Sequence, residues 1–570
     1  MKNQIQQARG LEPADFVLKN CTVVDVFCGE LLSADIAVCG EIIIGLGEYS
    51  GKNEFNCNGA YVCPGFMEGH IHIESSMLSP GQFSKTILPH GTTTVICDPH
   101  EIANVAGIPG VKYFLEESSK SGCSIFVMAP SCVPATNLEN SGAILNSDDL
   151  EEILDLEQVL GVAEMMNFPG VIFQDDEVMK KLALGKRRKV PVDGHAPGLT
   201  GKDLQAYIGT GIQSDHECST VAEAKEKLIS GMYLFIREGS TAKNLEDLYP
   251  VITVQNSRRC LLVTDDCHPE ELLKEGHMDR ILRKAIKLGI DPVTAIQMVT
   301  LNVADCFDLH DRGAVAPGRI ADLVVFESLE DIRPKAVFKS GKKVTDKQAT
   351  VRVNKKDIVP KYPTVFDSVN VNIEKLSFEI PAKGEIARVI QVNKNQLITE
   401  AVELPIIIAN GFAVSDPEND ILKLAVVERH NATGNIGLGF VQGIGLKKGA
   451  IASTVGHDSH NITVIGCNDQ DMHSVVKALI EQGGGLAIVC DGVVDASLVL
   501  DVAGLMSSSS ADEVAKAFSE LLRVAANLGV QVSDPFMLMS FLALPVIPHL
   551  KMTDLGLVDV DLFSHTSLWV

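Results

Sequence analysis

Long apolar runs and paired cysteine motifs are missing from this 570-residue sequence. Its apolar stretches are interrupted by Gly, Asp, His or Pro before they reach the about 20 residues that a membrane helix needs. The first residues, MKNQIQQARG, lack the apolar segment of a signal peptide, and the 14 cysteines are scattered without a CxxC pair. These absences predict a cytoplasmic chain with reduced cysteines and no membrane partner.

Basic side chains are scarce relative to acidic ones, with 49 Lys and Arg against 74 Asp and Glu and a net charge of -25. This charge repels polyphosphate and anionic lipid, so we expect no nucleic-acid partner. A small neutral or cationic ligand suits the charge better. The hydrophobic content of 46% and the mean hydropathy of +0.16 are typical of a globular protein, and the length allows two or three domains.

Two distant segments show the same β pattern. Residues 16–49 read as short alternating strands with turns, and residues 313–344 repeat this pattern after Arg312. The first piece is too short to fold alone. We therefore predict that the two segments close into one small β-sandwich domain, residues 1–62 and 313–360, and that the chain between them is an insertion.

The inserted segment, residues 63–312, repeats a short β-rich run followed by an amphipathic helical stretch. Eight such runs occur, at residues 64–74, 91–99, 123–130, 159–166, 189–198, 211–217, 232–240 and 260–266. Eight βα units predict an α/β fold of the (β/α)8 TIM-like barrel type. Beyond Val351, clustered Lys and Asp with Pro360, Pro363 and Pro381 predict a linker. We expect residues 385–570 to form a separate C-terminal α+β domain.

Metal-ligand residues recur at the ends of the predicted barrel strands. His70 and His72 lie two apart on the first strand, so both imidazoles leave one face, although such a pair alone also occurs as exposed histidines. Four later strands end in the same kind of residue, which are Glu164, His195, His216 and Asp265. The carboxyl ends of barrel strands form the active-site rim. Four imidazoles and two carboxylates there predict two divalent metal ions, with ligands suited to Mn, Fe or Zn.

Other polar residues of the rim allow two interpretations. Asp98, His100 and Glu101 follow the second strand, and they either orient the metal-binding histidines, hydrogen-bond the substrate, or begin a helix with Asp98 as its cap. Glu74 also allows two interpretations: it either supports the metal ligands or is a solvated residue of the rim. For Asp265, the alternative to metal binding is a helix N-cap before PEELLKEG.

Several motifs resemble known enzymes. PGFMEGHIH, DGHAPG, SDHE, TDD and GAVAPGRIADLVV resemble the amidohydrolase superfamily. Within it, GHIHIESSM, TTVICDPHEIANV, SCVPAT, AEMMNFPGV, IREGS with KNL following, and GLGFVQGIGLKKGAIASTVGHDSHNITVIG resemble the bacterial adenine deaminases over essentially the whole chain. Many binuclear members carry a carboxylated lysine on the fourth strand, whereas this strand offers Glu164. That residue either bridges two metals or shuttles a proton, and we favour a metal-linked role.

The resemblance implies hydrolytic deamination of adenine to hypoxanthine and ammonia by a metal-activated hydroxide, as part of purine salvage. It implies two divalent ions, Mn²⁺ first and Fe²⁺ or Zn²⁺ as alternatives, and a homodimer or higher homo-oligomer. Asp265 is the expected acid and base, with Glu164 next in line. Arg237, Glu238 and Ser240 are expected to face the site. The alternatives are a cyclic amide or imide hydrolase on the same scaffold, and a non-enzymatic metal-binding protein.

The GHDSHN segment of the C-terminal domain contains His457, Asp458 and His460. It suggests either an extra metal site, an active-site lid, or a turn held by hydrogen bonds from the side chains of Asp458 and Ser459. We favour the turn.

Overall fold

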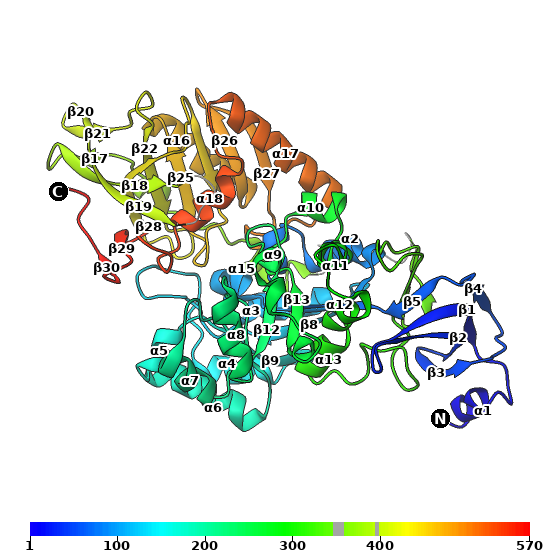
Figure 1. Cartoon of the computed structure of the whole chain (residues 1–570). Helices are drawn as coiled ribbons and strands as arrows, with labels where there is room; N and C mark the ends of the chain where they lie inside the picture. The colour runs from blue at the N-terminus through cyan, green and yellow to red at the C-terminus, as the bar shows by residue number, and fades with distance from the viewer. Residues whose placement is uncertain (346–357, 394–397) are drawn as a thin grey trace.

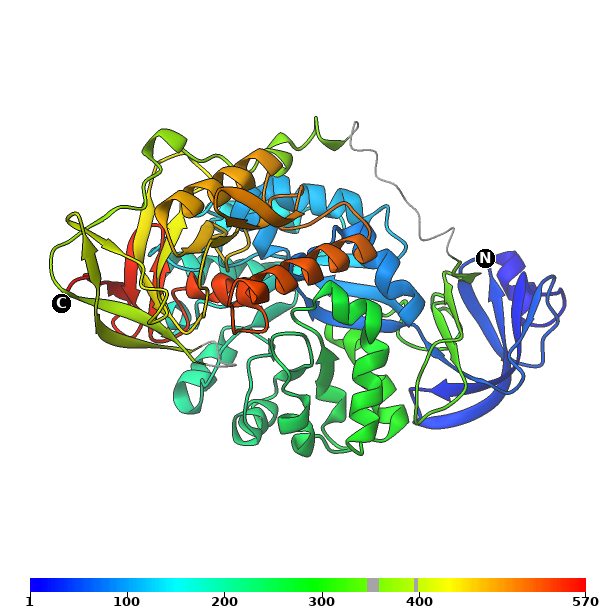
Figure 2. The same cartoon turned by 90° about the horizontal axis from the view of Figure 1, so that it is seen from above.

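The computed structural model describes residues 1–345, 358–393 and 398–570. An N-terminal sheet lies at one end, a region of parallel strands in the middle and a C-terminal region at the other end, with the two termini far apart (Figures 1 and 2). Lys355, Lys356 and Asp357 of the predicted linker lie outside the described residues. None of the helices in the described ranges combines the length and the apolar character needed to cross a membrane.

Strands from both predicted β segments join in one sheet. Its spatial order is β16-β15-β14-β5-β1-β2-β3, with β4 beside β1. β14 runs antiparallel to β5, from Leu323 opposite Pro64 to Phe326 opposite Tyr61. The strands are β1 (Phe16–Asp25), β2 (Glu30–Cys39), β3 (Ile42–Gly47), β4 (Glu54–Asn56), β5 (Tyr61–Pro64), β14 (Leu323–Phe326), β15 (Ala336–Lys339) and β16 (Lys342–Lys343), preceded by helix α1 (Lys2–Ala8).

All eight strands predicted between residues 63 and 312 are present. They form a five-stranded parallel sheet, β10-β9-β8-β7-β6, and a three-stranded parallel sheet, β11-β12-β13. Their bounds are β6 (Phe66–Ile71), β7 (Thr92–Cys97), β8 (Ser124–Ala129), β9 (Val159–Met165), β10 (Val192–Gly194), β11 (Ser214–Asp215), β12 (Tyr233–Arg237) and β13 (Cys260–Val263). β6, β7 and β13 are buried along their whole length, as parallel strands covered on both faces are.

Hydrogen bonds also join the edges of these two sheets. At one seam, Asp265 N donates to His70 O and His72 N donates to Asp265 O, both at 3.0 Å. At the other, Gln213 N donates to Val192 O at 3.0 Å. The eight strands therefore curl toward one another, and their carboxyl ends meet on one side.

Helices alternate with the parallel strands, as the repeating pattern predicts (Figure 1). They are α2 (Pro80–Ile87), α3 (His100–Ser118), α4 (Ser147–Leu154), α5 (Phe168–Ile172), α6 (Asp176–Arg188), α7 (Gly201–Gly209), α8 (Val221–Ile229), α9 (Leu245–Leu248), α10 (Pro269–Lys274), α11 (Met278–Lys287), α12 (Pro292–Met298) and α13 (Leu301–Cys306).

The C-terminal region is built on a second eight-stranded sheet, in the order β19-β18-β23-β22-β25-β24-β26-β27. Its strands are β18 (Ile386–Val392), β19 (Thr399–Pro405), β22 (Ile421–Val427), β23 (Ile436–Gln442), β24 (Ala450–Ser453), β25 (Ile462–Gly466), β26 (Gly485–Cys490) and β27 (Val493–Val499). The helices are α15 (Pro363–Phe366), α16 (Asp469–Gln482), α17 (Ala511–Asn527) and α18 (Pro535–Leu542). Two small sheets contain β17 (Ile380–Pro381), β20 (Ile407–Ala409) and β21 (Phe412–Val414), and β28 (Leu550–Thr553), β29 (Gly556–Asp559) and β30 (Ser564–His565).

Candidate metal centre

The structure gathers all six predicted metal ligands at the carboxyl ends of the parallel strands. His70 is on β6 and Glu164 on β9. His72 directly follows β6, His195 follows β10 and His216 follows β11, while Asp265 lies two residues beyond β13. Five of the six side chains are almost fully buried, and His195 is a quarter exposed. Parallel strands end on one edge, so residues more than a hundred positions apart converge there.

Glu164 lies at the centre of this cluster and divides it between its two oxygens. Oε1 is 3.3 Å from His72 Nε2, and Oε2 is 2.6 Å from His195 Nδ1 and 3.1 Å from His216 Nε2. Burial alone would raise the pKa of Glu164, but the imidazoles of His216 and His195 hold it well below its usual range. The carboxylate therefore lies between imidazoles on both sides, with one oxygen toward His72 and the other toward His195 and His216.

Asp265 is held in an unusual backbone conformation, with φ at +64°. Its main chain forms both hydrogen bonds of the β6 seam, so the strain is fixed by the fold. Oδ1 lies 3.6 Å from His70 Nε2 and 3.2 Å from His72 Nε2, and Oδ2 accepts a hydrogen bond from Arg237 Nη1 at 2.9 Å. Burial opposes its charge, yet His70, His72 and Arg237 keep the pKa of Asp265 well below its usual range.

The donor atoms of this cluster suit divalent metal ions. Imidazole nitrogens and carboxylate oxygens lie within 4.8 Å of one another in several sets, which include His70 with His72 and Asp265, and His70 with Glu164 and His216. His70 Nε2 is buried and has no hydrogen-bond partner. Such an orphaned nitrogen in a buried, acidic setting fits a metal ligand, and a mixed nitrogen and oxygen donor set fits Mn, Fe or Zn.

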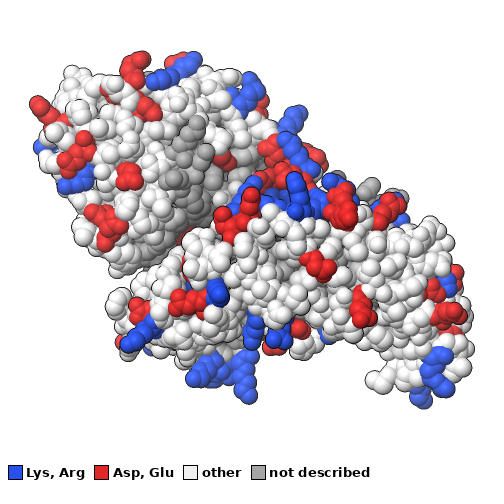
Figure 3. Space-filling model, in the orientation of Figure 1, with Lys and Arg blue, Asp and Glu red and all other residues white. Residues whose placement is uncertain are grey.

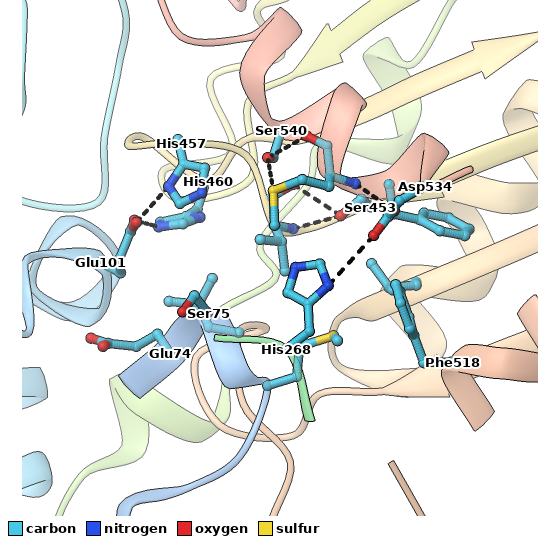
Figure 4. A pocket seen from close by; sticks show the side chains of 16 residues that line it. Glu74, Ser75, Glu101, His268, Ser453, His457, His460, Phe518, Asp534 and Ser540 are labelled. Atoms are coloured by element: carbon cyan, nitrogen blue, oxygen red, sulfur yellow. Dashed lines mark hydrogen bonds and ion pairs between the residues drawn. The ribbon is translucent and has the colours of Figure 1, made fainter. Parts of the chain in front are cut away.

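A second cluster adjoins the first and draws on the C-terminal region. Glu101 Oε1 lies 2.5 Å from His457 Nδ1, and Glu101 Oε2 is hydrogen-bonded to His460 Nε2 (Figure 4). His100 connects the clusters, with Nδ1 3.5 Å from Glu164 Oε1 and Nε2 3.9 Å from Asp458 Oδ1. These five side chains also combine ligand types that hold metals, and His100, Glu101 and Asp458 have ligand atoms within 4.8 Å.

The favoured interpretation of GHDSHN is therefore wrong in part. Residues 457–459 do form a turn, but His460 N donates to Gly456 O, and Asp458 Oδ2 has no hydrogen-bond partner. The imidazoles point instead to Glu101, which lies more than 350 residues earlier. A local pattern could not reveal this contact.

The helix-cap interpretations also need correction. Helix α3 begins with Pro99 as N-cap and without a side-chain cap, while Asp98 Oδ2 lies 3.1 Å from His100 Nδ1. Asp98 O also meets His72 Nδ1 at 3.0 Å, so this residue supports two imidazoles. Asp265 is not a cap either, because α10 begins after His268.

Three residues expected at the site lie beside the clusters. Glu74 Oε1 accepts a hydrogen bond from Ile102 N at 3.1 Å. Ser240 Oγ lies 2.5 Å from Glu271 Oε2. Glu238 Oε1 forms an ion pair with Lys284 Nζ at 2.7 Å. Arg237 is at the site, between Asp265 and Glu217.

Glu217 was missed by the sequence interpretation. Its Oε1 lies 3.5 Å from His216 Nε2 and 3.7 Å from His195 Nδ1, and it also binds the Arg237 guanidinium. Its position directly after the rim residue His216 was the available signal, but alternating side chains would have placed it on the other face.

Comparison of the sequence with known proteins identifies the family of this chain. Residues 61–344 match the amidohydrolase family and residues 396–564 the adenine deaminase C-terminal domain. The chain is 48% identical to adenine deaminase 2 of Carboxydothermus hydrogenoformans over 99% of this chain and 98% of that protein. It is 49% identical to the adenine deaminase of Desulfatibacillum aliphaticivorans and 45% identical to that of Clostridium acetobutylicum, each over 99% of both chains.

The chain belongs to the adenine deaminase family. The identity extends over both matched segments, so the parallel-strand region and the C-terminal region both carry the family's sequence. The predicted resemblance is confirmed.

Proposed function

We propose that this protein is a metal-dependent aminohydrolase that converts adenine to hypoxanthine and ammonia. The observation that carries the proposal is the placement of Glu164 and Asp265 among four rim imidazoles in a chain of the adenine deaminase family. The cyclic amide alternative is not favoured, because Glu164 stands where those relatives are expected to carry a lysine.

We assign the catalytic module to residues 63–312 as a (β/α)8 barrel. The hydrogen bonds at both seams of β6–β13 support a closed barrel. The pairing of β5 with β14 in one sheet supports a composite β-sandwich domain of residues 1–62 and 313–360. The separate eight-stranded sheet that contains β18 and β27 supports a C-terminal α+β domain of residues 385–570.

Two divalent ions are assigned to the barrel rim. His70, His72 and Asp265 with Glu164 Oε1 would hold one, and His195 and His216 with Glu164 Oε2 the other. Bound divalent metals would supply a hydroxide-like nucleophile at neutral pH, because they lower the pKa of water to about 7. Mn²⁺ is the first candidate.

Within this scheme Asp265 carries the proton. Oδ2 accepts a hydrogen bond from Arg237, and the Asp265 carboxylate is the proposed acceptor of a proton from the attacking water, which it returns to the departing amino group. Arg237 also fixes the carboxylate plane. Glu164 would hold the ions through its two oxygens, which lie 3.3 Å from His72 Nε2 and 3.1 Å from His216 Nε2, and we therefore assign it a metal-linked role ahead of proton transfer.

We further propose a cytoplasmic homo-oligomer acting on small molecules in purine salvage. On the face in Figure 3, Lys and Arg are interspersed with Asp and Glu, without the continuous basic surface that nucleic acid needs.

The deciding experiment measures ammonia release from adenine by protein freed of metal with a chelator and reloaded with Mn²⁺. We expect activity only after reloading, and loss of both metal and activity in the double variant His70→Ala and His72→Ala. A fully active metal-free protein, or no ammonia from adenine after reloading, would overturn the proposal.

A further inference from the structure

Four of the five side chains in the second cluster bring ligand atoms together between two regions of the chain. His100 Nε2 and Glu101 Oε1 come from the start of α3, in the parallel-strand region. His457 Nδ1 and Asp458 Oδ1 come from the loop between β24 and β25, in the C-terminal region. The four side chains are only 3% to 10% exposed. Residues more than 350 positions apart therefore share one buried polar site.

The separations of these atoms suit one small cation. His100 Nε2 lies 3.6 Å from Glu101 Oε1 and 3.9 Å from Asp458 Oδ1, and His457 Nδ1 lies 3.9 Å from Asp458 Oδ1. A tetrahedral ion with ligands about 2.0–2.2 Å away holds the ligand atoms roughly 3.3–3.6 Å apart. Glu101 Oε1 and His457 Nδ1 lie closer, at 2.5 Å, and would separate by about 1 Å to share an ion.

Neighbouring groups leave these atoms free to bind a cation. His100 Nδ1 lies 3.1 Å from Asp98 Oδ2, and donation of the ring proton to this carboxylate leaves the lone pair on Nε2. The same pairing of carboxylate and imidazole recurs at zinc sites. Glu101 Oε1 and Asp458 Oδ2 are buried and have no hydrogen-bond partner. Buried acceptors without donors indicate that a positive group belongs between them.

The hydrogen bonds of His460 exclude it as a ligand. Gly456 N donates to His460 Nδ1 at 3.1 Å, so the ring proton is on Nε2. His460 Nε2 donates this proton to Glu101 Oε2 (Figure 4). The hydrogen bond orients the Glu101 carboxylate and leaves Oε1 toward the other three ligand atoms.

The charge of the cluster favours a divalent cation. Within the described residues, every ion pair of Glu101 and of Asp458 is with a histidine and none is with Lys or Arg. Two buried carboxylates between neutral imidazoles leave two negative charges to be offset. Glu101 and His457 also line a pocket that opens to solvent, and its described lining contains further carboxylates but no Lys or Arg, so a cation has an entry path.

We propose that His100, Glu101, His457 and Asp458 bind a third divalent ion, with Zn²⁺ as the first candidate, separate from the two ions assigned to the rim. Four protein ligands leave no position open for a reacting water, so this ion is structural. It links α3 to the loop after β24 and thereby joins the C-terminal region to the parallel-strand region. Since the inference concerns metal binding alone, it does not depend on the substrate.

The test counts the Zn²⁺ ions that stay bound when the loaded full-length protein passes through gel filtration. We expect three ions per chain in the wild type and two in Asp458→Asn, which keeps the shape of the side chain but loses its charge. Affinity for the third ion should fall by more than the about 10- to 100-fold that loss of a residue supporting a ligand costs. Asp495→Asn, at an exposed aspartate of β27, is the matched control and should keep three ions.

Two further variants separate this site from the rim and from a hydrogen-bonded network. The double variant His70→Ala and His72→Ala should lose the rim ions and keep the third. His457→Gln keeps a donor for Glu101 but removes the ligand nitrogen, so it should lose only the third ion. A wild type that holds three ions but releases no ammonia from adenine would contradict the proposed function and not this site.

Two results would overturn the inference. A folded wild type with only two ions, both lost in the double variant, would mean that the second cluster pairs its histidines and carboxylates without a metal. Three ions in both Asp458→Asn and His457→Gln would place the third ion elsewhere. If neither variant folds, zinc X-ray absorption of the double variant decides: four nitrogen and oxygen ligands with imidazole scattering support the site, and a six-coordinate shell overturns it.

Discussion

At the scale of single residues, Asp265 shows how the fold prepares one carboxylate. A left-handed backbone is rare for residues other than glycine, although Asp and Asn tolerate it best. Here the two hydrogen bonds of the β6 seam fix it, and Arg237 holds one carboxylate oxygen. The position of this residue at the end of the eighth strand could be predicted from sequence, but its strain and its guanidinium partner could not, because both depend on chain segments that meet only in the folded state.

The first prediction separates metal binding from proton transfer at this residue. Asp265→Asn keeps the shape and tolerates the same backbone, but it removes the basic oxygen. Turnover of adenine should fall by roughly 10²-fold or more, as expected for a general base, while KM changes much less. Steady-state kinetics with metal analysis checks this.

Two results would reassign the residue. Loss of metal along with activity would make Asp265 chiefly a ligand. Near-normal turnover with both ions retained would move the proton transfer to another group, with Glu164 examined next.

A second residue-scale prediction concerns acid stability. His277 is fully buried beside Thr92, and burial, with the charge of Arg280, lowers its pKa to about 3. An unfolded histidine titrates near 6.5. Between these values the unfolded chain binds a proton that the folded chain does not, so the free energy of unfolding decreases as pH falls, by up to about 1.4 kcal/mol per pH unit from this group.

His277→Gln should therefore weaken the dependence of the urea midpoint on pH between 7 and 4, even though the variant is less stable at pH 7. His310→Gln, at an exposed histidine, serves as the control and should leave the slope unchanged. An identical slope in wild type and His277→Gln would show that this residue does not titrate as inferred.

At the scale of elements, periodicity predicted the eight parallel strands and their order, because each strand is a short buried run followed by a helix. Strand ends were less accurate: β11 spans only Ser214–Asp215 where residues 211–217 were predicted, since His216 and Glu217 leave the sheet for the site. Contacts between distant elements, such as Glu101 with His460, could not be predicted, because the local pattern of apolar and polar residues does not encode them.

Helix α3 illustrates a local break that serves the site. The helix begins with His100 and Glu101 and is interrupted at Gly107, which has φ +58° and ψ −145°. A Cβ there would lie 3.1 Å from Ala143 Cβ, in a conformation that side chains other than glycine rarely adopt.

Gly107→Ala should therefore lower the free energy of unfolding by about 1–3 kcal/mol. Because the start of α3 positions the second cluster, adenine turnover should fall as well. Gly209→Ala in α7, where a Cβ would meet nothing within 4 Å and the backbone is helical, should be neutral or slightly stabilising. Equal denaturation midpoints for the two variants would contradict this account.

At the scale of the whole molecule, polar contacts around the site join the C-terminal region to the parallel-strand region. Asn140 donates to both oxygens of Asp554, at 2.9 and 2.6 Å, and Asn461 Nδ2 donates to Asn140 O at 2.7 Å. Thr553 Oγ1 donates to Leu138 O at 2.8 Å. The same docking brings His457 and His460 to Glu101, so the second cluster exists only in the assembled chain.

Metal removal should consequently destabilise the whole chain and not the rim alone. Ions that bind only the folded state stabilise it by about 2.7 kcal/mol when their concentration is a hundred times Kd. We expect the Mn²⁺-loaded protein to unfold at a higher temperature than the chelated protein, with a smaller rise in the double variant His70→Ala and His72→Ala. Because Asp458 Oδ1 lies 3.9 Å from His100 Nε2 between the two regions, Asp458→Ala should reduce the rise for the C-terminal region more than for the parallel-strand region, as followed by calorimetry with proteolysis of each region. An equal rise in the wild type and in the double variant would mean that the ions bind outside the rim ligands.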